Sequence, residues 1–191
     1  MSKSAHNKFV FKKVNSFHEK QRALYFMETV AQNLYKCSPP PPPQIIFVAK
    51  HKNKIVGTIA LDHKNKQGLL PLEEIYKIDF DRAPFLFQRE LTIQFGRWMT
   101  ITKNVSIRLF YVAALHAIDD GKTHGLFEAK QPIADYMKKL GFDLRQIDGT
   151  KLIIEKIPSA GRKYYQSKPK PKVYMIVLNQ IVKTMETKLK E

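Results

Sequence analysis

Residues 88–102 read QRELTIQFGRWMTIT, and the rest of the chain is best interpreted outward from this stretch. β-Branched and aromatic residues dominate it, as is typical of a strand. Gly96 lies inside the run, and a glycine there marks a bulge or the close approach of a ligand. A segment with helical periodicity follows at once, and the start of a helix attracts anions. We therefore expect a central strand that leads into a helix, with a bulge or a ligand contact near Gly96.

The segments on either side predict a mixed α/β order. Ser16 and Glu19 form a capping-box pattern for a helix over residues 17–36. Five consecutive prolines at 39–43 predict a rigid polyproline II loop. The expected strands are residues 7–14, 44–49, 55–61, 91–100, 123–129, 143–147, 152–157 and 173–178, and the further helices are expected to open near Asn104, Pro132 and Ile181. Residues 72–80 fit either a short helix or a strand, and residues 159–171 fit a basic loop.

The length and composition are those of one folded domain. The chain has 191 residues, of which 43% are hydrophobic. We expect a single domain with its core at about residues 8–157, followed by the basic loop and a C-terminal strand and helix within 158–191. One cysteine, Cys37, excludes an internal disulfide, and the six histidines lack metal-site spacing, so no metal is expected. The sequence shows no signal-peptide pattern and no long apolar run, so we expect a cytoplasmic protein without a transmembrane segment.

The net charge of +16 is concentrated at the two ends of the chain. Residues 1–54 carry +8, residues 55–150 carry +1 and residues 151–191 carry +7. Such a field attracts polyanions: nucleic acid, a membrane surface or an acidic protein. A solvated lysine-rich surface explains the same charges without any partner.

Residues 91–118, the strand at 123–129 and then QPIADYMKKLGFDL together resemble the second half of the GNAT acyltransferase fold, which ends on a Lys-Leu-Gly-Phe motif. The resemblance covers about residues 9–157. It implies an α/β, GNAT-like fold, with a central mixed sheet splayed at its middle and flanked by helices. Proteins of this family bind an acyl thioester where two parallel strands part. The sequence departs from the family pattern in two places. Residues 102–108 contain no glycine where common acetyltransferases have a glycine-rich phosphate loop. The tyrosine that those enzymes often use as general acid falls at Met137, with Tyr136 one residue away.

A glutamate followed within one strand by an arginine, and then a glycine-free entry into a buried helix, is more similar to the acyl-homoserine-lactone synthases and long-chain N-acyl amino acid synthases. That resemblance implies an N-acyltransferase acting on an amine, such as that of an amino acid, with acyl carrier protein or acyl-CoA as donor and no tightly bound cofactor. It implies Glu90 as base and Arg97 as the group that binds an acceptor carboxylate. The residues expected to hold the phosphopantetheine arm are Trp98, Met99, Thr100, Lys103, Asn104, Ser106 and Arg108.

Other interpretations remain open for the same residues. Glu90 and Arg97 form an ion pair in the simplest alternative, Trp98 and Met99 are core residues, and Arg108 is solvated. At the level of the whole chain, RKYY at residues 162–165 and KPKPK at 168–172 are typical of a nucleic-acid surface that stacks bases and binds phosphates. A GNAT-like interaction module without catalysis is the third interpretation. The basic ends, in turn, suit an acidic acyl carrier protein.

Overall fold

The computed structural model describes residues 9–102 and 105–190. Its strands are β1 (Val10–Lys13), β2 (Ile45–His51), β3 (Lys54–Asp62), β4 (Tyr76–Lys77), β5 (Thr92–Thr100), β6 (His124–Ala129), β7 (Arg145–Gln146), β8 (Lys151–Leu152) and β9 (Lys172–Val177). Its α-helices are α1 (Phe17–Tyr35), α2 (Pro71–Ile75), α3 (Ser106–Asp119), α4 (Gln131–Lys139), α5 (Ser159–Gln166) and α6 (Leu178–Lys190). Short 3-10 turns occupy Phe80–Arg82, Arg89–Leu91 and Ile154–Lys156.

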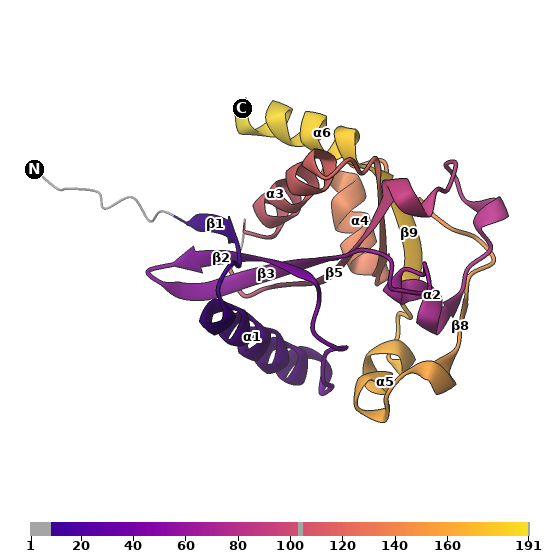
Figure 1. Ribbon diagram of the computed structural model, residues 1–191, viewed down its shortest axis with the longest axis horizontal. Coiled ribbons are helices and arrows are strands. Elements are labelled where there is room, and N and C mark those ends of the chain that lie inside the picture. The colour runs from indigo at the N-terminus through magenta and orange to yellow at the C-terminus, as the bar shows by residue number, and fades with distance from the viewer. Residues whose placement is uncertain (1–8, 103–104, 191) are drawn as a thin grey trace, which may run out of the picture.

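Seven strands form one mixed sheet in the order β1-β2-β3-β5-β6-β9-β7, and β4 and β8 form a separate two-stranded sheet. The pair β5–β6 is parallel and its neighbours in the sheet are antiparallel. Helices α3, α4 and α6 lie on one side of the large sheet, while α1 and α5 lie on the opposite side (Figure 1). The predicted α/β architecture, a mixed sheet flanked by helices, is confirmed.

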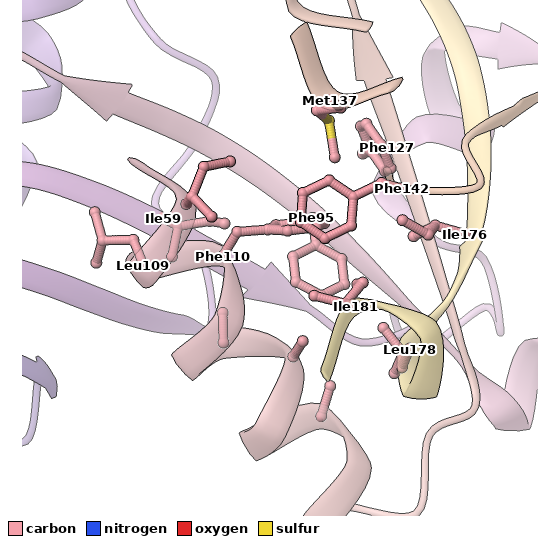
Figure 2. Packing of buried hydrophobic residues seen from close by; sticks show 14 of the residues in the cluster. Ile59, Phe95, Leu109, Phe110, Phe127, Met137, Phe142, Ile176, Leu178 and Ile181 are labelled. Carbon is pink, nitrogen blue, oxygen red and sulfur yellow. The ribbon is translucent and has the colours of Figure 1, made fainter. Parts of the chain in front are cut away.

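The main core lies between the sheet and the α3, α4 and α6 layer. Figure 2 shows its aromatic centre, where the ring of Phe110 on α3 meets side chains from β5, β6 and the segment after α4. Ring centroids lie 5.0–6.2 Å from Phe110 for Phe95, Trp98, Phe127 and Phe142. Burying each such side chain contributes about 1.5–3 kcal/mol. This packing fixes the start of α3 against the middle of β5.

Two smaller clusters lie on the other face. Ala23 and Met27 of α1 pack on Ile46 and Val48 of β2. The second cluster joins α2, β4 and α5 to the opposite face of β6 and β9; its buried members are Leu70, Leu72, Tyr76, Leu126, Ile147, Ile157, Tyr165, Val173 and Met175. The large sheet is therefore covered on both faces, as expected for its buried parallel strands.

The first helix shows half of the predicted capping box. The Ser16 hydroxyl accepts a hydrogen bond from the Glu19 backbone N–H at 3.2 Å. The Glu19 carboxylate does not reach back to the cap, because it pairs with Lys50 and with Lys12. Those two contacts tie the start of α1 to β1 and β2, and the lysines lower the pKa of Glu19 against the opposing effect of burial.

The region after α4 differs most from the sequence prediction. Residues 152–157, expected as a strand, form the end of β8 and a 3-10 turn, and residues 159–166, expected as loop, form α5. Tyr165 is buried, and the Tyr164 ring stands edge-on to Tyr35 with centroids 5.0 Å apart. Tertiary burial of these two rings stabilises a helix that is too short to form alone. Because neither ring is exposed, the base-stacking surface predicted for residues 162–165 is not supported.

Within residues 9–102 and 105–190, no helix is both long enough and apolar enough to span a membrane.

Candidate functional site

Strands β5 and β6 run together over a short distance and then part. Within the described residues they are joined by three pairs: Thr92 with His124, Ile93 with Gly125 and Gln94 with Leu126. Beyond these pairs β5 continues along β3 on its other edge, and β6 continues along β9. The sheet therefore opens at its middle, which confirms the predicted splay.

A bulge interrupts β5 at the opening. Ala60 pairs with Gly96 and Thr58 pairs with Met99, so two residues of β5 stand opposite Ile59 alone. These are Arg97 and Trp98, and Arg97 takes a left-handed conformation with φ 49°. The predicted bulge near Gly96 is thus present, with its strained backbone on the following residue.

The bulge reverses the alternation of side chains along β5. Phe95 faces the α3 side, and the inserted residue lets Trp98, not Arg97, take the next position there. The Trp98 indole stacks on Phe110 and donates from Nε1 to the Ser106 carbonyl at 3.0 Å. Arg97 is thereby placed on the face that carries α1 and the proline loop.

The Arg97 guanidinium is buried and bound on that face. Its Nη1 donates to Asp62 Oδ2 at 2.8 Å, and its Nη2 donates to the Pro41 carbonyl. Asp62 Oδ1 accepts the Gln44 backbone N–H at 2.9 Å. These contacts, which we call the Arg97 clamp, fix the loop after α1 to the end of β3 and the bulge. The Arg97 Nε–H is buried and has no partner among the described residues.

Gly96 borders open space. A Cβ placed on Gly96 meets no atom within 4 Å, whereas one placed on Gly125 of β6 lies 2.7 Å from the Phe95 ring. Gly96 also does not take a positive φ. Neither packing nor backbone conformation therefore requires a glycine at position 96, and the approach of a ligand there stays a prediction.

A carboxylate missed by sequence reasoning lies on β6 just beyond the last pair with β5. Glu128 is partly buried, and its two oxygens accept hydrogen bonds from the Tyr76 and Tyr165 hydroxyls at 2.9 Å each. Burial raises the pKa of Glu128 to about 7, although both hydroxyls and the charges of Arg97 and Lys130 act in the opposite direction. A carboxylate that titrates near neutrality is suited to general base catalysis.

Lys130 follows Glu128 on the same face. Its Nζ donates to the carbonyl and the hydroxyl of Ser167 at 3.2 and 2.6 Å, and it lies 4.8 Å from the centre of the Tyr164 ring. Burial lowers the pKa of Lys130. Near the point where β5 and β6 part, this face thus carries the Glu128 carboxylate, Lys130, and Arg97 with its partner Asp62.

The structure separates the two predicted catalytic residues. Glu90 lies in the turn before β5, its side chain is 72% exposed, and it pairs with Lys64. Arg97 lies beyond the point where β5 and β6 part and pairs with Asp62. The alternative in which Glu90 and Arg97 form an ion pair with each other is therefore wrong. Glu90 also lies next to the end of β5 that is paired with β6, away from the point where the two strands part.

The predicted phosphopantetheine residues lie at the opposite end of β5 and at the start of α3. Thr100 pairs with Gly57, Met99 packs toward the α1 cluster, Ser106 begins α3 without a side-chain cap, and Arg108 is exposed. Lys103 and Asn104 lie outside the described residues. Trp98 and Met99 both contribute to packing, as the core alternative predicted. Whether any of them binds a donor stays a prediction.

The fold does not place a tyrosine at the position where common acetyltransferases have their general-acid tyrosine. Met137 is fully buried in the main core, and the neighbouring Tyr136 is 43% exposed on α4. Among the described residues, no three His, Cys, Asp or Glu side chains are grouped so that they could hold a metal ion.

The sequence contained one signal for Glu128. The strand reads HGLFEA, and a carboxylate at the fifth position of an apolar strand has to be partnered or functional. Its partners were not recognisable, because Tyr76 precedes it by 52 residues and Tyr165 follows it by 37.

Comparison with known proteins is informative at the level of structure. No family model and no curated protein matches the sequence. Among solved structures, the CoA-dependent acyl-homoserine lactone synthase BjaI superposes with a TM-score of 0.65 at 7% identity, covering 96% of this chain and 90% of that one. FeeM, an N-acyl amino acid synthase from uncultured soil microbes, gives 0.63 at 13% identity, covering 91% and 93%. An acetyltransferase of the GNAT family from Staphylococcus aureus Mu50 gives 0.54 at 12% identity, covering 88% and 99%. This protein therefore has the GNAT acyltransferase fold.

Proposed function

We propose that this protein is an N-acyltransferase that moves an acyl group from a pantetheine thioester to the amine of a small molecule, with an amino acid as the acceptor class. The donor is acyl-CoA or an acidic acyl carrier protein. The observation that carries the proposal is the juxtaposition of an opened parallel strand pair with a carboxylate of near-neutral pKa just beyond the opening. The fold neighbours support acyl transfer in general.

The unpaired edge of β5 suits the donor. Beyond Gln94 this edge has no strand partner among the described residues. An amide-rich pantetheine arm binds such an edge as an added strand would, by backbone hydrogen bonds. Donors on this edge that meet the developing oxyanion would each contribute about 3–4 kcal/mol to the transition state.

Glu128 suits the acceptor step. The amine nitrogen bonds to the thioester carbonyl carbon while the Glu128 carboxylate takes a proton from that nitrogen. The C–S bond then breaks to release a thiolate, and the protonated Glu128 returns the proton to the thiolate or to water, so that a thiol and an amide are formed. A base of this kind contributes roughly 10²–10⁴-fold to the rate. The Arg97 guanidinium is bound to Asp62 and to the Pro41 carbonyl, and its Nε–H is buried. We therefore give Arg97 the role of a fixed positive charge that favours the charged form of Glu128.

The test begins with binding, since it requires no known reaction. A thermal-shift series with acyl-CoAs of graded chain length and with acyl carrier protein identifies the donor. A ligand whose free concentration is 100 times its Kd stabilises the folded protein by about 2.7 kcal/mol. Thiol release is then measured with a panel of amino acids and with the corresponding amines.

Two isosteric variants compare the structure-based and sequence-based assignments of the base. Glu128→Gln is expected to lower the acyl-transfer rate by about 10²–10⁴-fold, and Glu90→Gln is expected to lower it far less. The reverse order would return the role of base to Glu90. No thiol release with any donor, together with no thermal shift, would remove the proposal.

A further inference from the structure

Two tyrosine hydroxyls hold the Glu128 carboxylate from elements outside the large sheet. Tyr76 belongs to β4 and donates to Oε2, and Tyr165 belongs to α5 and donates to Oε1, both at 2.9 Å. The rings of Tyr76 and Tyr165 stand edge-on to each other with centroids 6.4 Å apart. Each carboxylate oxygen therefore has one fixed partner, and one further acceptor position on each oxygen remains.

We propose that Tyr76 and Tyr165 are positioning residues that orient the Glu128 carboxylate toward the opening between β5 and β6, and that β4 and α5 serve to bring these hydroxyls there. The inference rests on the proposed function, since it assigns the residues that prepare its base. It gives a role to α5, which the sequence predicted as a loop.

The electrostatic surroundings of the Tyr76 and Tyr165 hydroxyls suit hydrogen-bond donors that keep their protons, and not groups that give up a proton. Burial, and then the nearby Glu128 carboxylate, raise the pKa of both Tyr76 and Tyr165 far above the ordinary value, so both hydroxyls keep their protons at any working pH. The other groups that face Glu128 electrostatically are Arg97 on β5 and Lys130 between β6 and α4, which favour its charged form. Tyr164 on α5 also faces it, and burial and this carboxylate raise the pKa of Tyr164. The two tyrosine hydroxyls are neutral partners of Glu128: they fix the orientation of its carboxylate and also favour its charged form.

The experiment substitutes each donor by phenylalanine, which keeps the ring. Tyr76→Phe and Tyr165→Phe are compared with Tyr164→Phe, the adjacent residue of α5, whose hydroxyl makes no hydrogen bond to Glu128. The pKa of Glu128 is read directly by carbon-13 NMR of side-chain-labelled glutamate, with its signal assigned by its loss in Glu128→Gln. Thermal melts confirm that each variant is folded.

Each loss of a donor to the charged form is expected to raise the Glu128 pKa by on the order of one unit. Tyr164→Phe is expected to leave it unchanged. In the transfer assay, the acidic limb of the pH–rate profile should move to higher pH by the same amount. The rate then falls near pH 7 and recovers at higher pH. A tyrosine that only packs would lower the rate equally at every pH.

The outcomes separate the two ideas. An unchanged Glu128 pKa in both Tyr76→Phe and Tyr165→Phe overturns the positioning role, whatever the activity. A shifted pKa with no acyl transfer from any donor supports the arrangement around Glu128 and overturns the proposed function.

Discussion

Glu128 illustrates at the scale of one residue how a site and stability oppose each other. Its folded pKa of about 7 exceeds the ordinary value of 4.5, so the folded state binds this proton more tightly than the unfolded state. The resulting stability is fully present below about pH 4.5 and is lost as pH rises through 7. Glu128→Gln mimics the protonated form and should not lose it.

The variant is therefore expected to melt at a higher temperature than the unchanged protein at pH 8, and at a similar temperature at pH 4. Differential scanning calorimetry across this range checks the prediction. Glu90→Gln is the control of opposite sign, because the hydrogen bond and charge of Lys64 lower the pKa of Glu90. A melting-temperature difference for Glu128→Gln that does not change with pH would contradict the assigned pKa.

The glycines of the two parting strands give a second prediction. Gly125→Ala forces a Cβ against the Phe95 ring and is expected to destabilise by about 1–3 kcal/mol. Gly96→Ala meets open space and should change stability by no more than about 0.5 kcal/mol. Urea denaturation measures both.

Position 96, which tolerates a Cβ without loss of stability, is expected to be sensitive to a larger side chain in the transfer assay if a ligand approaches Gly96. Gly96→Val then raises KM or abolishes transfer while the protein stays folded. Unchanged kinetics in Gly96→Val would show that the open space over β5 is not used.

At the scale of elements, the Arg97 clamp joins the proline loop, β3 and the bulge of β5. Asp62→Asn leaves the Arg97 charge buried without a counterion, since both side chains are less than a tenth exposed. The expected loss is about 3–5 kcal/mol. Hydrogen exchange at the Gln44 amide, which Asp62 holds in the unchanged protein, should accelerate as the loop is released.

A surface pair serves as the matched control for that prediction. Asp143 and Arg145 are 39% and 50% exposed and pair at 2.7 Å. Asp143→Asn is expected to cost no more than about 1 kcal/mol, because solvent screens an exposed pair. Equal losses for the two aspartate variants would show that the clamp is no more than a surface contact.

At the scale of the whole molecule, the charge of +16 predicts how the donor arrives. If the donor is an acidic carrier protein, raising the ionic strength from about 0.05 to about 0.5 M should weaken its binding through screening. The uncharged acyl-pantetheine is the control donor, and its rate should change little. Equal salt responses for the two donors would separate the basic ends from donor recognition.

The sequence by itself determined the main elements and their order. Periodicity and capping placed α1, β2, β3, β5, β6 and α4 close to their observed bounds, because the apolar positions that define them are local. The resemblance in residues 91–142 led to the fold, including a sheet that splays at its middle.

Only the tertiary structure decided what lies around the opening. One inserted residue in β5 turned Arg97 toward Asp62, and no local pattern encodes which residue of a bulge takes the left-handed conformation. The partners of Glu128 come from β4 and α5, and α5 itself is stabilised by burying the tyrosine that binds this carboxylate. Contacts between residues so distant in the chain depend on packing, and packing follows from the whole fold and not from any single segment.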